Sequence, residues 1–205
     1  MEGTIRYGSR TLYYRGAAGL LERPAIAAVG TRRPAAESRK AGYRMISRMC
    51  VLTDMPVVTG LAAGCDTIAA RAALDAGRPV IAVLPSSLDE IYPRSNRDLA
   101  EEIVRKGGCL ISEYAPGEEL RKWKFIARDR LMARIASAVI VIQCGKESGT
   151  MYTVRAAHRL GRPLACWMPE DTSAGDFGGN TLMAAEYGAS PIRIVRDLRE
   201  FLEKI

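Results

Sequence analysis

The chain has 205 residues, of which 48% are hydrophobic and 26% are charged, the balance of a globular protein with a substantial core. Its formal net charge of +7 favours a polyanionic partner. No apolar run is long enough to span a membrane, and the first residues lack the apolar stretch of a leader, so we expect a cytoplasmic protein with no membrane partner.

Taken in chain order, short apolar runs alternate with longer amphipathic runs. Residues 1–24 form an N-terminal extension, with one strand expected at 11–15 against the edge of a sheet. From residue 25 to 205, strands are expected at 26–29, 56–59, 79–84, 109–112, 139–142 and 163–167, with an edge strand at 191–195. Helices are expected at 36–50, 65–76, 97–106, 124–135, 181–187 and 196–204, and another begins near Gly149. This order predicts an α/β core domain over 25–205, a mainly parallel sheet with helices on both faces.

In such sheets, ligands bind at the carboxyl ends of the strands, so the strand-end loops are the candidate site. Several of these loops carry glycine, which allows close backbone approach, and basic residues lie in or near them. The candidate phosphate-binding residues here are Gly30, Thr31, Arg32, Arg33, Gly60, Gly64, Asp66, Lys122, Arg128, Lys146, Ser148, Gly149 and Thr150. Any one of these basic residues alone is explained as an ordinary solvent-exposed surface charge. Their gathering at one edge of the sheet favours an anion-binding site.

The segment 139–162 carries the strongest local signal. An apolar strand is followed by a loop, and Ser148, Gly149 and Thr150 stand where the next helix begins. Unpaired N–H groups and the positive end of the helix dipole attract a phosphate there, and Lys146 adds a cation at the rim. The alternative is that Ser148 or Thr150 only caps the helix.

Metal binding and histidine-dependent catalysis are disfavoured by the cysteines and the single histidine, His158. The five cysteines are Cys50, Cys65, Cys109, Cys144 and Cys166, and no pair has the Cys-x-x-Cys spacing. An odd number of cysteines, several of them in or beside apolar segments, indicates reduced, buried thiols. We therefore expect no metal site and no cofactor.

Eight segments in order over nearly the whole chain resemble the DprA/Smf family of DNA-processing proteins, core domain only. They are LYYRG at 12–16, AAVGTRR at 27–33, TGLAAGCD at 59–66, LPSSLDEIYPRSN at 84–96, ISEYAPG at 111–117, FIARDR at 125–130, KESGTMYTVRAAHRLGRPL at 146–164 and GGNTLMAAEYGA at 178–189. The resemblance implies an extended Rossmann-like fold and a homodimer. It also implies binding of single-stranded DNA and assistance to loading of a RecA-type recombinase in recombination or transformation.

Within that resemblance, Arg32 matches the arginine that grips a phosphate, Arg128 and Arg130 match an arginine pair, and Phe125 matches a nearby aromatic residue. We expect Arg32 and Arg128 to contact the ligand and to have no structural role. The family usually reads FPxRNR, whereas this chain has Ile126 for the proline and Asp129 for the asparagine. Asp129 therefore either pairs with Arg128 or Arg130, or weakens DNA binding.

Three aromatic residues are candidates for stacking on unpaired bases, namely Tyr92, Phe125 and Trp123. Ordinary helix packing is the alternative for either Trp123 or Phe125, because they stand two positions apart. Tyr92 has the alternative role of ordering its own loop. Tyr92 and Phe125 are the preferred candidates.

A second function class uses the same superfamily fold, namely nucleotide-binding sensors and LOG-type phosphoribohydrolases. The latter carry PGGxGTxxE at this strand-to-helix junction, where this chain reads CGKESGTMYT with Thr153 in place of the glutamate. Of the remaining strand-end carboxylates, Asp66 is expected to cap a helix and Glu113 to hold its own loop. No catalytic constellation is complete, so we expect a binding protein and not an enzyme.

Overall fold

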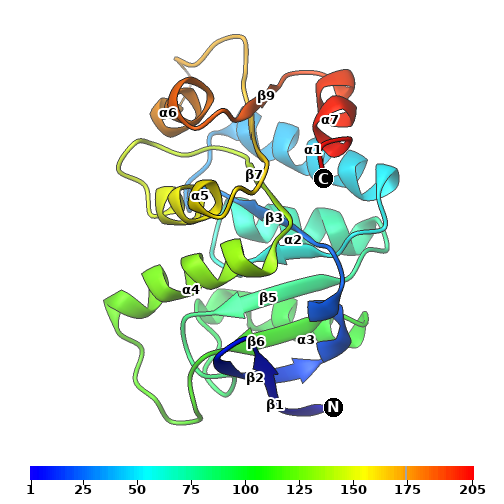
Figure 1. Ribbon diagram of the computed structural model, residues 1–205, viewed down its shortest axis with the longest axis vertical. Helices are drawn as coiled ribbons and strands as arrows, with labels where there is room; N and C mark the ends of the chain where they lie inside the picture. Colours follow the sequence, from blue (N-terminus) through cyan, green and yellow to red (C-terminus); the bar gives the residue numbers. More distant parts are fainter. Residues whose placement is uncertain (174) are drawn as a thin grey trace.

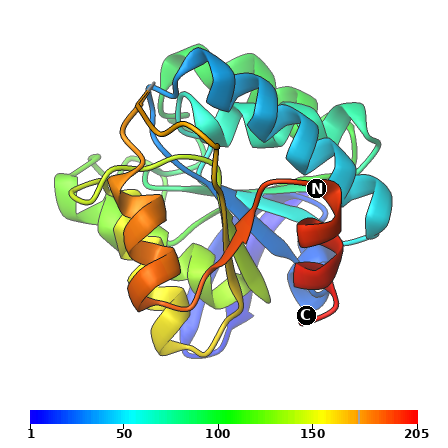
Figure 2. The same ribbon diagram turned by 90° about the horizontal axis from the view of Figure 1, so that it is seen from above.

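The computed structural model describes residues 1–173 and 175–205, whose strands form one sheet between two layers of helices (Figures 1 and 2). The strand order is β1-β2-β6-β5-β4-β3-β7-β8-β9. The strands are β1 Glu2–Tyr7, β2 Arg10–Gly16, β3 Ile26–Val29, β4 Val57–Thr59, β5 Val80–Leu84, β6 Cys109–Ser112, β7 Ala138–Val141, β8 Leu164–Trp167 and β9 Ser190–Ile192. The seven strands from β6 to β9 in this order pair in parallel, which confirms the predicted α/β class and Rossmann-like fold.

Helices cover both faces of this sheet, as predicted. Their bounds are α1 Ala36–Leu52, α2 Cys65–Asp75, α3 Arg97–Arg105, α4 Lys122–Ile135, α5 Thr150–Arg159, α6 Gly178–Glu186 and α7 Val195–Leu202, with short 3-10 turns at Ala18–Glu22 and Arg94–Asn96. Apolar residues of α1, α2, α3 and α7 pack on one face, and those of α4, α5 and α6 on the other. Along β3 the residues alternate between the two cores, because successive side chains of a strand point to opposite faces.

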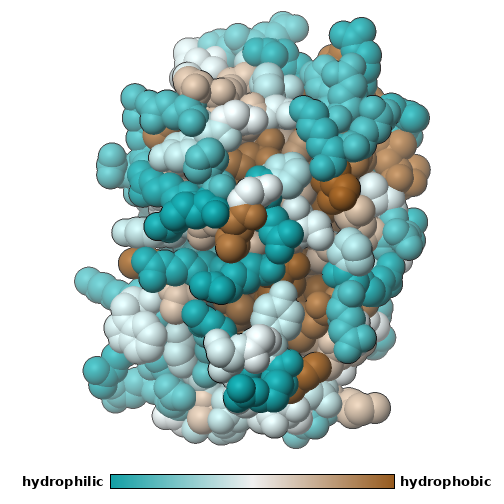
Figure 3. Space-filling model, viewed as in Figure 1, coloured by the Kyte–Doolittle hydropathy of each residue, from teal (hydrophilic) through white to brown (hydrophobic). Residues whose placement is uncertain are grey.

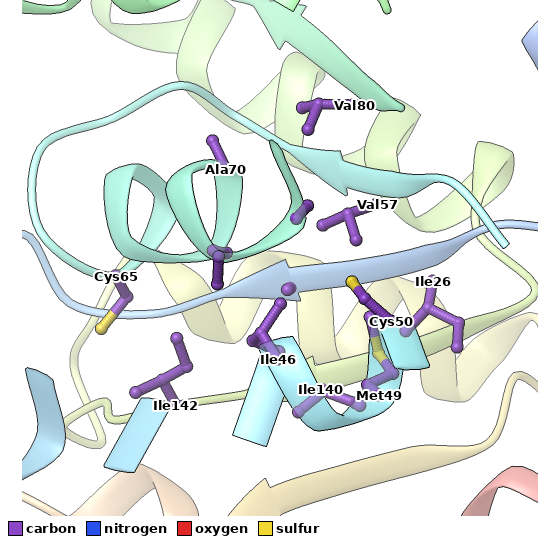
Figure 4. Packing of buried hydrophobic residues seen from close by; sticks show 14 of the residues in the cluster. Ile26, Ile46, Met49, Cys50, Val57, Cys65, Ala70, Val80, Ile140 and Ile142 are labelled. Carbon is purple, nitrogen blue, oxygen red and sulfur yellow. The ribbon is translucent and has the colours of Figure 1, made fainter. Parts of the chain in front are cut away.

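The core beneath α1 and α2 explains why the central strands are continuously apolar. Ile46 and Met49 of α1 lie against Ile26 of β3 and Ile140 of β7 (Figure 4). All of β3, β4, β5, β7 and β8 is buried, as expected for parallel strands covered on both faces. The predicted burial of all five cysteines is also confirmed.

The N-terminal segment differs from the expectation of a single edge strand. The expected strand is present as β2, but β1 pairs with it antiparallel and forms the sheet edge, while β2 itself pairs with β6. Gly8 at the tip of this hairpin has a φ of +58°, which glycine adopts without strain. The sequence of β1 alternates weakly, and its partner strand supplies the hydrogen bonds that hold it extended.

Two C-terminal boundaries also differ from the prediction. Helix α6 begins three residues before the expected 181, because the Asp176 carboxylate accepts the Gly178 N–H (3.1 Å) and buried Asn180 of the first turn accepts the Cys144 N–H (2.7 Å). Strand β9 ends at Ile192 and not at 195, because the Asp197 carboxylate accepts the Arg193 N–H (2.8 Å) and starts α7. Both differences depend on side-chain hydrogen bonds that helix and strand periodicity does not report.

The topology places a switch point beside β3. The chain runs from β3 through β4 and β5 to β6 on one side, and then crosses to β7 on the other side of β3. The loops after β3 and β7 therefore leave the sheet in different directions and open a crevice between them. This crevice lies where the sequence predicted the anion site.

The surface is mostly polar. On the face shown in Figure 3, hydrophilic residues predominate and hydrophobic residues are visible in separated areas. Within the described ranges 1–173 and 175–205, no helix has the length and apolarity needed to cross a bilayer.

Candidate functional site

A cavity of about 440 Å³ opens at the switch point. Its walls come from the loop after β3, from the segment that leads from β4 into α2, from α4 and from the start of α5. The lining residues that the sequence predicted are Gly30, Thr31, Arg32, Arg33, Asp66, Phe125, Arg128, Ser148, Gly149 and Thr150. Ten of the candidates, drawn from four separate segments, therefore meet in one place.

A second cavity of about 120 Å³ adjoins the first and contains the aromatic candidates. The two cavities share Arg32, Ala62, Phe125 and Arg128. The rings of Tyr92 and Phe125 meet edge to face at 5.4 Å, and Arg32 Cζ lies 5.2 Å from the centre of the Phe125 ring. An exposed guanidinium and two aromatic rings thus line the passage between the cavities, as a phosphate and an adjacent base require.

The loop after β3 is held from two sides by its backbone. The Thr31 N–H donates to the Gln143 carbonyl (2.7 Å), and the Thr31 carbonyl accepts the Cys65 N–H (3.0 Å). Gly64 has a φ of +79°, and a Cβ there would lie 2.5 Å from the Thr31 carbonyl oxygen, so only glycine fits. This clamp leaves Arg32 exposed at the cavity.

The start of α5 combines a partial cap with open space. Ser148 Oγ accepts the Thr150 N–H (3.3 Å), so one N–H is satisfied within the turn. This bond agrees with the alternative that Ser148 caps the helix. The Gly149 N–H has no acceptor within the described residues. Gly149 has an ordinary helical φ of −53°, and nothing lies within 4 Å of a Cβ built there. Its glycine is therefore not required by the backbone, and the turn is open toward the cavity.

Arg128 has a structural role that contradicts our expectation of a purely ligand-contacting arginine. Its side chain is buried, although the residue lines both cavities. Its guanidinium donates to the Gly60 carbonyl, to the Val83 carbonyl (3.4 Å) and to the Asp129 carboxylate (2.8 Å). A Cβ at Gly60 would overlap this guanidinium, so Gly60 is required by packing.

Two carboxylates stand beside Arg128 in the wall of the larger cavity. Asp66 accepts the Gly60 N–H (2.9 Å) and the Ala62 N–H (3.4 Å), so it holds this loop and does not cap its helix as expected. Burial raises the pKa of Asp66. Burial likewise raises the pKa of Asp129 to about 6, against the opposing effect of Arg128. Of the partners expected for Asp129, Arg128 is confirmed.

Several predicted residues lie outside the two cavities. Lys122 and Arg130 are exposed on α4, and neither they nor Gly64 and Lys146 line either of the two cavities. Helix geometry turns Arg130 away from the wall that Arg128 occupies. Glu113 pairs with Arg10 of the N-terminal hairpin, so it is not a member of the site.

Of the two neighbouring aromatic candidates on α4, Phe125 lines both cavities, whereas Trp123 is 56% exposed and lines neither. Trp123 meets Tyr114 edge to face at 5.8 Å, and Lys124 Nζ lies 3.9 Å from the centre of the Tyr114 ring. Lys124 also pairs with Glu118 at 3.1 Å. These contacts form a separate cluster outside the two cavities, whereas Phe125 faces the cavities.

Seven further residues line the larger cavity that the sequence did not single out as ligand contacts. They are Val29, Ala62, Ile126, Asp129, Met132, Tyr152 and Thr153. A helical-face argument finds Met132 and Thr153, because Met132 follows Arg128 and Thr153 follows Thr150 by about one turn.

The fold and the site define a class: an α/β protein with a cavity lined by basic and aromatic residues at the switch point of a parallel sheet. Over residues 4–203 the chain matches the family described as DNA recombination-mediator protein A, and it belongs to that family. The resemblance found in the sequence is thereby confirmed.

Individual relatives agree with this assignment. DNA processing protein DprA of Streptococcus pneumoniae is 36% identical over 153 residues, which are 75% of this chain and 53% of that protein. The chain spans about half the length of the curated relatives it matches. The solved DNA processing protein A of Helicobacter pylori, described for its single-stranded DNA binding mode, superposes with a TM-score of 0.85 at 28% identity, covering 100% of this chain and 97% of that chain. The Streptococcus pneumoniae structure superposes at 0.82 with 30% identity, covering 93% of this chain and 65% of that chain.

Proposed function

We propose that this chain binds single-stranded DNA across the two adjoining cavities and acts in DNA processing. The observation that carries the proposal is the position of Arg32, which faces the larger cavity and also stacks on Phe125 in the passage to the smaller one. Arg32, Arg33 and the N–H groups at the start of α5 hold phosphates without regard to sequence. Phe125 and Tyr92 offer ring faces or edges to an unpaired base.

The wider role that we propose follows from the family. Assistance to a RecA-type recombinase in recombination or transformation, and action as a homodimer in the cytoplasm, are properties that family membership implies. The described structure of the Helicobacter pylori relative, with its single-stranded DNA binding mode, adds weight to the choice of ligand. Residues Lys122, Lys146 and Arg130 are retained in this proposal as contacts with DNA that extends beyond the cavities.

We propose binding without chemistry at this site. The threonine at 153 offers no carboxylate where a phosphoribohydrolase has its glutamate, and Asp66 is engaged by backbone N–H groups. Glu113 is paired with Arg10 of the N-terminal hairpin. Incubation with nucleoside monophosphates is expected to release no free base, and enzyme-dependent release would favour the phosphoribohydrolase alternative.

Titration with labelled DNA tests the proposed ligand. We expect single-stranded DNA to bind more tightly than duplex of the same length, because duplex hides the base faces. With about two or three phosphates held, affinity should fall about tenfold between about 50 and 200 mM salt. Equal affinity for both forms would contradict the proposal. Salt-insensitive binding, or tight binding of a mononucleotide alone, would favour a nucleotide sensor.

DNA affinity should also depend on pH through Asp129. Its pKa is raised to about 6 in the free protein, and a phosphate in the same cavity raises it further because like charges repel. DNA binding therefore takes up a proton, so affinity rises as the pH falls from about 8 and levels off below about 6. The charged groups facing Asp129 are Arg128, Asp66 and Arg32.

Asp129→Asn removes this titrating group and should flatten the pH dependence, measured as Kd between about pH 6 and 8. The expected change in the parent is up to about tenfold for each unit by which phosphate raises the pKa. Asp98→Asn, on the exposed side of α3, is the matched control and should keep the parent profile. If Asp129→Asn keeps the full slope, Asp66 is the titrating group and this prediction is wrong.

A further inference from the structure

The hydroxyl of Thr153 lacks a partner in the wall of the larger cavity. Thr153 is 1% exposed, and its Oγ1 forms no hydrogen bond with any described residue. Buried hydroxyls are normally paired, because burial without a partner forfeits the hydrogen bonds made with water. Ser38 Oγ is likewise unpaired, but Thr153 also lines the cavity proposed to bind DNA.

Thr153 lies in the first turn of α5, close to the N-terminus of the helix. Thr153 follows Thr150 by three residues, so the two side chains share one face of the helix. Helix α5 is 10 residues long, and Ser148 and Gly149 precede it at the cavity. The unpaired hydroxyl and the free Gly149 N–H thus belong to the same end of the helix, where the dipole is positive.

The charges around the cavity indicate which kind of ligand the hydroxyl meets. Arg32 and Arg33 are exposed at the cavity and form no ion pair within the described residues. Asp129, in contrast, is occupied by Arg128, and Asp66 by the N–H groups of its loop. The groups that remain available are donors, and a ligand that accepts several hydrogen bonds and carries negative charge suits them.

We propose that Thr153 Oγ1 donates a hydrogen bond to a phosphate oxygen held at the start of α5. Thr153 is then a further binding residue of the site, and its hydroxyl serves the ligand and not the fold. The inference rests on the proposed function in one respect, namely that the phosphate belongs to single-stranded DNA. The same chemistry suits free phosphate or a mononucleotide, and the experiment below separates these sources.

Thr153→Val tests this proposal, because valine keeps the branched shape and removes only the hydroxyl. The melting temperature should stay the same or rise, since no hydrogen bond of the free protein is lost. Affinity for a labelled single-stranded oligonucleotide should fall about tenfold, the effect of losing one hydrogen bond to a charged group. Thr153→Ser keeps the hydroxyl and should bind more tightly than Thr153→Val.

A second measurement keeps this inference separate from the proposed function. Inorganic phosphate should raise the melting temperature of the parent more than that of Thr153→Val, by preferential binding to the folded state. If the parent binds no single-stranded DNA but shows this phosphate effect, the proposed function fails and the inference stands. If Thr153→Val binds DNA and phosphate as the parent does, the inference is overturned. A marked fall in melting temperature with unchanged affinity of the folded fraction overturns it as well, because the hydroxyl is then structural.

Discussion

Arg128→Ala is expected to lower the free energy of unfolding by about 3–5 kcal/mol, the cost of removing one partner from a buried ion pair. The guanidinium of Arg128 is the ion-pair partner of Asp129 and also bonds the carbonyls of Gly60 and Val83. Its removal leaves the Asp129 carboxylate buried without its ion-pair partner. It also removes the hydrogen bond from Arg128 to the loop at Gly60 that Asp66 holds. For a protein of this size, the melting temperature should fall by roughly 10 °C.

Arg130→Ala is the matched control for this measurement. Arg130 lies two positions away in α4, is exposed and has no ion pair within the described residues. Its substitution should change the free energy of unfolding by less than about 0.5 kcal/mol. Denaturant unfolding followed by circular dichroism compares the two. Equal stability of both variants would contradict the structural role of Arg128.

Arg32→Ala is expected to weaken single-stranded DNA binding about tenfold to hundredfold while the fold survives. The size of the effect is that of one charge-assisted hydrogen bond to phosphate, about 1.5–3 kcal/mol. Because Arg32 is exposed and contacts the protein mainly through the face of Phe125, stability should change by less than about 0.5 kcal/mol. The slope of log affinity against log salt should also fall by about 0.7, the share of one phosphate.

Arg48→Ala separates a local contact from a loss of net charge. Arg48 is exposed on α1 and does not line either cavity, so its substitution removes the same charge elsewhere on the surface. Fluorescence anisotropy with a labelled oligonucleotide should show affinity close to that of the parent. If Arg48→Ala and Arg32→Ala weaken binding equally, DNA is attracted by the net positive charge of the protein and not by contacts in this cavity.

The sequence by itself determined the fold class and the edge of the sheet at which the site lies. Both depend on local patterns: β3 and β7 are buried on two faces and read as apolar runs, and their carboxyl ends necessarily lie at one edge. The glycine-containing turns are local as well. The loop residues Gly30, Arg32 and Gly149 can therefore be identified from the sequence alone, and so can the family.

Only the tertiary structure decided which of these residues meet and what each side chain does. In the sequence Arg128 looks like a free cation, but packing of α4 over β4 and β5 gives it buried carbonyl acceptors at Gly60 and Val83, 68 and 45 positions away. Lys122 and Lys146 carry the same charge, yet they lie outside the cavities. In the sequence, Thr153 is notable only because it stands where a phosphoribohydrolase has a glutamate. Only the packed structure shows that its hydroxyl has no hydrogen-bond partner. The physical reason is that periodicity reports which face of an element is buried, whereas a side chain's partners come from segments distant in sequence.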